Sequence, residues 1–216
     1  MSCVKFIDKM GSDLSVVNAA RVSFDISSKE LSDKDLGLIN YLAKHNHWTP
    51  FAHTCLTLLV EAPIYVSRQL AKHQVGLAWN EVSRRYVDYV PDIDRPLFWR
   101  KRAENKKQGS MDEPISSNEL ADRVLADVEF LTQKAYKELL ALRVCPEQAR
   151  MVLPQAMTTK WYWTGSLFAF NRVCSLRTQK DAQAETRYIA DEISSICYQH
   201  FPESWKALST KWEKSA

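Results

Sequence analysis

The sequence predicts an α+β fold, rich in helix with a small sheet, in a single domain spanning residues 1–216. Three observations predict it. A length of 216 residues is enough to bury one hydrophobic core. Apolar residues make up 45% and charged residues 25%, which is ordinary for a globular protein and excludes a disordered or fibrous chain. Several long segments have helical apolar periodicity, whereas a short early segment has strand character.

The first elements are short. Val4–Phe6 is a candidate strand, and Ser15–Ser23 a candidate small helix. We expect a helix over Ser32–His45, because Ser32 can act as an N-cap with Asp35 three residues later. Cys55–Val60 is short, leucine-rich and apolar at nearly every position, which predicts an interior strand that is apolar on both faces.

The middle of the chain combines a helix, an extended segment and a loop. Pro63 suits the start of a helix over Ile64 to about His73. Val82–Val90 has extended character. Residues 95–118 contain Gly, Pro and a basic cluster, which predicts a long surface loop rather than a domain boundary.

Helices dominate the second half. A seam of apolar residues spaced by three or four predicts a long helix, packed either inside the subunit or against a partner subunit: Leu120, Val124, Val128, Leu131, Ala135, Leu139 and Leu142. Pro146 opens a short helix that carries Arg150. Thr158–Leu176 and Asp181–Phe201 are expected to be two further helices.

Composition excludes several function classes. The 29 basic and 26 acidic residues give a net charge of +3, which argues against a protein that mainly coats nucleic acid. With five glycines and no GxGxxG or GxxxxGK[ST], glycine-rich phosphate loops are excluded. The sequence has neither an apolar run long enough to cross a membrane nor a secretory signal. Five scattered cysteines indicate reduced thiols, and hence the cytoplasm, or a host's cytoplasm for a viral protein.

Polar residues gather between Pro63 and Tyr86. Helical spacing places Gln69, Lys72 and His73 on one side. In an extended chain, Glu81, Ser83 and Arg85 would share a face, with Val82 and Tyr86 pointing the other way into packing. Such a row suits a nucleotide, because a hydroxyl and a guanidinium bind phosphate and a carboxylate accepts from a sugar or base. The alternative is a solvated edge with an internal Glu–Arg pair.

Two further groups of residues are candidates for a metal site or a ligand pocket. Three histidines occur within His45–His53, but no carboxylate or cysteine lies at ligand spacing, so we expect no metal. Arg150 and Arg177 are basic residues in apolar stretches, and each is either a helix-end residue that reaches solvent or a group aimed into a pocket.

Six segments in order resemble the flavin-dependent thymidylate synthases, and together they span most of the chain. They are AARVS at 19–23, HWTPFAH at 47–53, APIYVSRQ at 62–69, KHQ…NEVSRRY at 72–86, ARMVLP at 149–154 and SLRTQKDAQAE at 175–185. The family signature is RHR, seven residues, then Ser. This chain has Lys72-His73-Gln74 followed by eight residues before Ser83, so two guanidiniums are missing.

The resemblance implies a single α+β domain with a small antiparallel sheet packed against long helices. It implies reductive methylation of dUMP to dTMP, in which methylenetetrahydrofolate supplies the carbon and FAD, reduced by NADPH, supplies the hydride. It further implies a homotetramer whose active sites are shared between subunits, with neither nucleic acid nor membrane as a partner.

The resemblance also implies roles for individual residues. Arg177 is the expected catalytic cation, placed against the uracil edge to stabilise its electron-rich form. Expected dUMP positions are Gln69, Lys72, Glu81, Val82, Ser83, Arg84, Arg85, Arg150 and Arg177. Expected FAD positions are His47, Thr49, Lys72, His73, Gln74, Glu81, Ser166, Phe168 and Arg172.

Three rival hypotheses remain at this stage. A thiol-dependent thymidylate synthase would use Cys145 or Cys174, both in apolar surroundings that keep a thiol protonated. A non-catalytic protein of the same fold would bind nucleotide or flavin only, a reading favoured by the altered Lys72-His73-Gln74 segment. A nucleic-acid-binding protein would use the basic residues between Arg100 and Lys107, although the tryptophans are dispersed.

Overall fold

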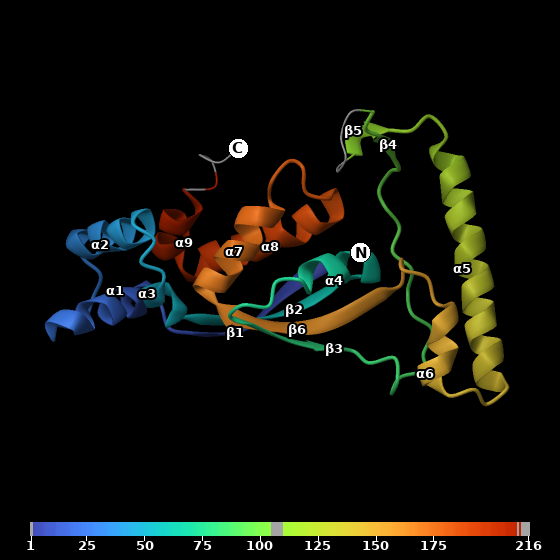
Figure 1. The fold of residues 1–216 in the computed structure, drawn as a ribbon, viewed down its shortest axis with the longest axis horizontal. Coiled ribbons are helices and arrows are strands. Elements are labelled where there is room, and N and C mark those ends of the chain that lie inside the picture. The colour runs from blue at the N-terminus through green and yellow to red at the C-terminus, as the bar shows by residue number, and fades with distance from the viewer. Residues whose placement is uncertain (1, 105–109, 211, 213–216) are drawn as a thin grey trace.

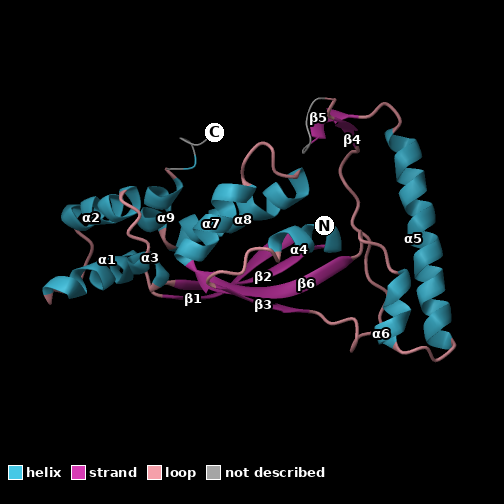
Figure 2. Cartoon of the chain, in the orientation of Figure 1, coloured by secondary structure: helices cyan, strands magenta, loops and turns pink. Residues whose placement is uncertain are grey.

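The fold, given by a computed structural model that describes residues 2–104, 110–210 and 212, is of the predicted α+β class. A four-stranded antiparallel sheet has the order β1-β2-β6-β3. Its strands are β1 (Cys3–Met10), β2 (Cys55–Pro63), β6 (Thr158–Ser166) and β3 (Leu77–Glu81). Figure 1 and Figure 2 show helices gathered over one face of this sheet.

Three helices cover the part of the core that lies against this face: α4 (Ile64–Leu70), α7 (Leu167–Arg177) and α8 (Ala184–His200). The central strand β2 directs Leu56, Leu58 and Val60 into it, all fully buried. The prediction of an interior strand is therefore confirmed by position. The prediction that both faces are buried is wrong, since the alternate residues of β2 are only half-buried.

An aromatic layer fills the core beneath α7. Trp79 and Trp163 are partners in the β3–β6 register, and Trp79 stacks on Trp161 with ring centroids 4.3 Å apart. Phe170 of α7 meets Trp163 edge-on at 5.6 Å. Large rings bury much apolar surface, so this layer fixes α7 over β6.

A second helical group packs at one end of the sheet (Figure 1). It comprises α1 (Asp13–Arg21), a 3₁₀ turn at Val22–Phe24, α2 (Asp33–Lys44), α3 (Thr49–Ala52) and α9 (Pro202–Ser209). The predicted capping of α2 is confirmed, because the Asp35 carboxylate accepts from the Ser32 backbone N–H at 2.9 Å. The helix α9 was not predicted from the sequence.

The long helix α5 (Asn118–Ala141) stands beside the short α6 (Pro146–Ala149), away from the sheet (Figure 1). Tyr136 is its one buried residue. Most of the predicted seam is exposed, with Leu120 at 62%, Val124 at 58% and Leu131 at 61%, whereas Ala135 and Leu139 are half-buried. The seam therefore does not pack inside the chain, and that alternative is wrong.

Two predicted elements are corrected. Thr158–Leu176 is not one helix: β6 occupies Thr158–Ser166, and α7 begins at Leu167 after Ser166 caps it by accepting from the Ala169 N–H at 3.2 Å. Val82–Val90 is not extended, because the strand β3 precedes it at Leu77–Glu81. The helix over Ala184–His200 and the strand over Cys3–Met10 match their predicted positions.

The predicted loop over residues 95–118 contains a small antiparallel hairpin of β4 (Arg100–Arg102) and β5 (Ser110–Pro114). Arg100 and Lys101 of the basic cluster are described, whereas Lys106 and Lys107 lie outside the described residues. The predicted helix after Pro63 ends at Leu70, three residues before His73. None of the described helices has the length and apolar character needed to cross a membrane.

Candidate nucleotide and flavin site

Arg177, His73 and Gln69 meet above the sheet. Arg177 is the last residue of α7, and its Nε donates to His73 Nε2 at 3.0 Å. Its Nη2 donates to the Gln69 backbone carbonyl at 3.3 Å. Burial, and then the charges of Arg177 and Arg172, lower the pKa of His73. A neutral His73 can therefore accept this hydrogen bond and orient the guanidinium.

The side chain of Gln69 is held by two residues of the loop and helix that follow Arg177. Its Nε2 donates to Gln183 Oε1, and its Oε1 accepts from the Thr186 hydroxyl at 3.3 Å. Gln183 in turn donates to Glu185 at 2.9 Å. Sequence reasoning missed Gln183 and Thr186, although the DAQAE segment that contains Gln183 was among the resembling motifs.

A second cluster lies where the loop after β3 meets α6. Arg85 Nε donates to Glu147 Oε2 at 2.9 Å, and Arg150 Nε donates to the Glu147 carbonyl at 3.1 Å. Ser83 Oγ accepts from the Arg85 backbone N–H at 3.3 Å. Arg85 and Arg150 are both exposed, so this cluster presents two guanidiniums and a hydroxyl to solvent. No hydrogen bond between described residues joins it to the Arg177 cluster.

The predicted row of Glu81, Ser83 and Arg85 does not form. Only Glu81 belongs to a strand, because the backbone turns at Ser83, whose carbonyl accepts from the Tyr86 N–H at 3.0 Å. Alternation of side chains requires an extended backbone, so it stops at this turn. Tyr86 is 78% exposed, which also overturns its predicted place in packing.

Arg84 points inward instead. Its side chain is 6% exposed, and its guanidinium lies 4.3 Å from the Tyr89 ring centroid and donates to the Tyr89 carbonyl. The Arg84 side chain thus stabilises its own loop. Nearby, Glu81 accepts from the Thr159 hydroxyl at 2.6 Å and from Trp79 Nε1 at 3.2 Å, and the Val82 N–H donates to the Lys160 carbonyl.

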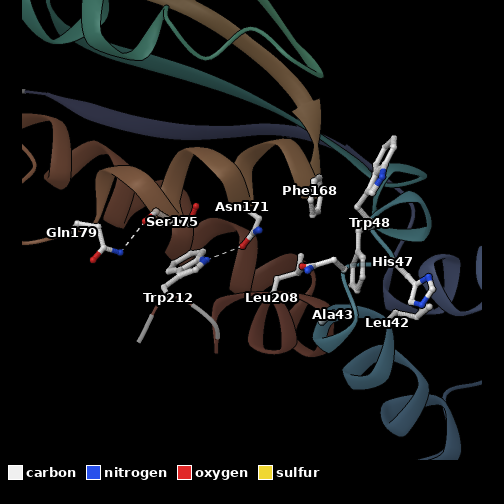
Figure 3. Close-up of a pocket in the computed structure, with 12 residues that line it drawn as sticks. Leu42, Ala43, His47, Trp48, Phe168, Asn171, Ser175, Gln179, Leu208 and Trp212 are labelled. Atoms are coloured by element: carbon white, nitrogen blue, oxygen red, sulfur yellow. Dashed lines mark hydrogen bonds between the residues drawn. The ribbon is translucent and has the colours of Figure 1, made fainter. Parts of the chain in front are cut away.

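A cavity of about 280 Å³ lies beside α7, between the two helical groups (Figure 3). Trp48 and Phe168 form one wall, with ring centroids 5.8 Å apart, and His47 lies at its edge. The cavity residues missed from the sequence include Asn171 and Trp212. The Trp212 indole donates to the Asn171 amide oxygen at 3.0 Å (Figure 3).

Residues of the expected flavin positions fit such a group. A flavin needs flat apolar surface for its rings and cations for its phosphates. Trp48 is 52% exposed beside His47 and Phe168, which supplies exposed ring surface. Lys72, Gln74 and Arg172 are exposed, and neither Lys72 nor Arg172 forms an ion pair with a described residue.

The remaining expected flavin positions begin two helices. Thr49 is the first residue of α3. Ser166 is the N-cap of α7, where its hydroxyl accepts a backbone N–H. Both hydroxyl-bearing residues therefore lie at helix starts, on either side of the Trp48–Phe168 contact.

Cys174 is not an activated nucleophile. Cys174 is fully buried and its pKa is raised by burial, so its thiol stays protonated. Cys145 is exposed, contrary to the predicted apolar surroundings. No three His, Cys, Asp or Glu side chains in the described part of the chain lie in position to hold a metal ion.

Comparison with known proteins identifies the family. The model of the thymidylate synthase complementing proteins matches residues 5–203. The chain belongs to this family. Family members named flavin-dependent thymidylate synthase include those of Thermus thermophilus and Thermosipho africanus. Each is 36% identical to this chain, and each match covers 95% of this chain. The match covers 74% of the Thermus protein and 90% of the Thermosipho protein.

Solved structures agree with this membership. The UMP/dUMP methylase PolB from Streptomyces cacaoi, bound with 5-Br dUMP, is similar with a TM-score of 0.89 and 28% identity. The match covers 97% of this chain and 95% of PolB. The same enzyme bound with 5-Br UMP is similar with a TM-score of 0.83. The family fold thus extends over nearly the whole chain.

Proposed function

We propose that this protein is a flavin-dependent thymidylate synthase that converts dUMP to dTMP by reductive methylation. The observation that carries the proposal is the meeting of Arg177, neutral His73 and Gln69 in a fold shared with a dUMP methylase. Arg177 is held at two of its nitrogens and stays oriented. It stabilises negative charge that develops on the uracil ring as C5 attacks the one-carbon unit.

The second cluster binds the phosphate of dUMP. Arg85 and Arg150, which both donate to Glu147, offer guanidiniums, and Ser83, which accepts from the Arg85 N–H, offers a hydroxyl. The Glu147 carboxylate competes with phosphate for Arg85, so dUMP binding moves Arg85 away from it. Glu81 accepts from the sugar or base, Lys72 adds charge, and Val82 and Arg84 shape the loop.

The flavin positions hold FAD by its rings and phosphates. His47 and Phe168 flank the rings, Thr49 and Ser166 offer hydroxyls, and the cations are Lys72 and Arg172. His73, Gln74 and Glu81 complete the set. A bound flavin reduced by NADPH supplies the hydride, and methylenetetrahydrofolate supplies the carbon. The chain's own residues bind the two ring systems, orient them and exclude water between them.

The active protein is a homotetramer in the cytoplasm, with sites shared between subunits. Two observations support the assembly. The seam of α5 exposes Leu120, Val124 and Leu131, a surface that a soluble monomer rarely leaves uncovered. The Arg177 cluster and the Arg85 cluster are separate within the chain, so apposed subunits can bring them to one nucleotide.

An anaerobic assay tests the function. Purified protein is loaded with FAD, reduced with NADPH and mixed with dUMP and methylenetetrahydrofolate, while flavin absorbance and dTMP are followed. We expect reduced flavin to reoxidise only when dUMP and the folate are both present, with dTMP formed in equal amount. Protein that binds FAD and dUMP but forms no dTMP would overturn the enzyme proposal in favour of a non-catalytic binding protein.

A further inference from the structure

A mostly buried ion pair ties the β4–β5 hairpin to the start of α8, beside the proposed nucleotide site. The guanidinium of Arg100 binds the Glu185 carboxylate at both ends, Nη1 to Oε1 at 2.8 Å and Nη2 to Oε2 at 2.9 Å. Arg100 Nε donates to Ser110 Oγ at 2.7 Å across the hairpin. The two side chains are only 18% and 17% exposed. This is a bidentate, mostly buried pair, unlike the exposed pairs of the protein surface.

The pair keeps Glu185 ionised. Burial opposes ionisation of Glu185, but hydrogen bonds from Arg100 and Gln183 outweigh it, so its pKa is lowered. A second acid, Asp94, lies close by. After burial, the charges of Glu185 and Asp94 both raise the pKa of Tyr65. Without the Arg100 charge, two carboxylates would share a partly buried region. An ionised carboxylate only accepts hydrogen bonds, so Glu185 imposes a direction on its neighbours.

Glu185 sets the orientation of the Gln183 amide, and Gln183 in turn sets that of the Gln69 amide. Gln183 turns its NH₂ group to Glu185, because its own oxygen would be repelled there. Its Oε1 therefore faces Gln69, which must donate through Nε2. The Gln69 Oε1 then accepts from the buried Thr186 hydroxyl. Each amide is locked against the 180° flip that a free glutamine can make.

The locked Gln69 amide retains one N–H and one oxygen lone pair in a fixed arrangement, on the residue whose backbone carbonyl accepts from Arg177. A uracil edge offers carbonyl oxygens and an N3–H donor, whereas cytosine offers an amino donor and an N3 acceptor. A free amide could flip to suit either base, but a locked amide suits one. We propose that the Arg100–Glu185 ion pair makes Arg100 a positioning residue that fixes the hydrogen-bond direction of Gln69 and thereby selects uracil over cytosine nucleotides.

This inference rests on the proposed function, and nucleotide binding tests it apart from turnover. Calorimetry of the FAD-loaded protein measures the Kd of dUMP and of dCMP for wild type, Arg100→Gln and Glu185→Gln. We expect the ratio of the two Kd values to narrow about tenfold in both variants, the size of one buried hydrogen-bond mismatch. Arg100→Lys keeps the charge without the bidentate geometry and recovers part of the ratio.

Lys101→Gln is the matched control. Lys101 neighbours Arg100 and pairs with Glu113 at 2.9 Å, but both side chains are at least half exposed, and the pair has no contact with Gln183 or Gln69. The ratio of the Kd values of dUMP and dCMP for Lys101→Gln should equal that of wild type. A folded Arg100→Gln or Glu185→Gln variant with an unchanged ratio would overturn the inference alone. Wild-type protein that binds neither nucleotide would overturn the proposed function as well.

Discussion

Arg177 is held by Gln69 of α4 and by His73, which follows that helix, and these two contacts fix its position. Replacing it with alanine removes a cation from the uracil edge while leaving the core of α7 intact. We expect Arg177→Ala to lower kcat by about 10²–10³-fold, the usual effect of losing one electrostatic donor. Steady-state dTMP formation measures it. Arg187→Ala, a change on the next helix, is the control, and equal losses in both would contradict the assignment.

His73 makes the site sensitive to acid. Its folded pKa lies below the ordinary 6.5, so the neutral form dominates at neutral pH and the bond from Arg177 is intact. As the pH falls below about 6.5, His73 is protonated first in the unfolded chain. The contribution of neutral His73 to the free energy of unfolding therefore decreases, and it is lost once the pH falls below the pKa of His73 in the folded protein. The charges of Arg172 and Arg177 both act on His73 and favour its neutral form.

We therefore expect kcat/KM for dUMP to decline on the acid side of neutrality. Once protonated, His73 has no lone pair to accept from Arg177, and the two cations repel. His73→Gln keeps an acceptor that does not titrate. The pH profile of this variant should lose the acid limb, even if its maximum is lower. An identical acid limb in wild type and His73→Gln would assign the effect to another group.

At the scale of elements, buried polar contacts fix how helices meet. Asp13, at the start of α1, is 5% exposed and accepts from the backbone N–H groups of Ser204 at 2.9 Å and Glu203 at 3.2 Å. It therefore caps α9 from a helix at the other end of the chain. The last helix of the chain is docked by its first.

Asp13→Ala should lower the free energy of unfolding by about 1–2 kcal/mol, because two helix N–H groups lose their acceptor. Urea denaturation followed by far-UV circular dichroism measures the change. Asp8→Ala is the control, since the Asp8 carboxylate is exposed and bonds only its neighbour's N–H at 2.7 Å. A loss below about 0.5 kcal/mol for Asp13→Ala would mean that water replaces the cap.

Element types were predictable where one local pattern dominated, as in α2 with its Ser32–Asp35 cap and in α8. Thr158–Ser166 was misread because the helical stripe after Leu167 was extended backwards. Its own alternation of Trp161, Trp163 and Gly165 is typical of a strand. The turn at Ser83 was missed because NEVSRRY has no glycine or proline to mark it.

The candidate site was predictable mainly as a set of residues, not as a geometry. Resembling segments supplied Arg177, His73 and Gln69, but only the fold shows that they touch. Arg100 was assigned to a solvated loop, since nothing in a basic cluster indicates a partner 85 positions away. Long-range pairs of this kind are decided by tertiary packing.

At the scale of the whole molecule, α5 carries the exposed surface on which the proposed homotetramer depends. Most of its seam is exposed in the single chain, and Tyr136 is the one buried residue of this helix. We expect Val124→Asp with Leu131→Asp to dissociate the proposed tetramer, since buried charges without partners are strongly unfavourable. Light scattering measures the mass. Lys134→Asp, on an exposed position of the same helix, should leave the mass unchanged.

If active sites are shared between subunits, a variant that no longer forms the tetramer should also lose its activity. Dissociated Val124→Asp/Leu131→Asp protein should bind dUMP weakly and form almost no dTMP, although its circular dichroism spectrum stays close to that of wild type. A fully active monomer would contradict the shared site.

The pairing of β2 with β6 also bears on how the chain is made. Cys55 pairs with Ser166, so one edge of β2 has no partner until a segment about 100 residues downstream has been synthesised. At roughly 5–20 residues per second, the nascent chain carries that open strand edge for roughly 5–20 s. A chain truncated within α5 would therefore keep an open strand edge and tend to pair with other chains. Synthesis of β6 covers this edge and so protects the nascent protein from aggregation.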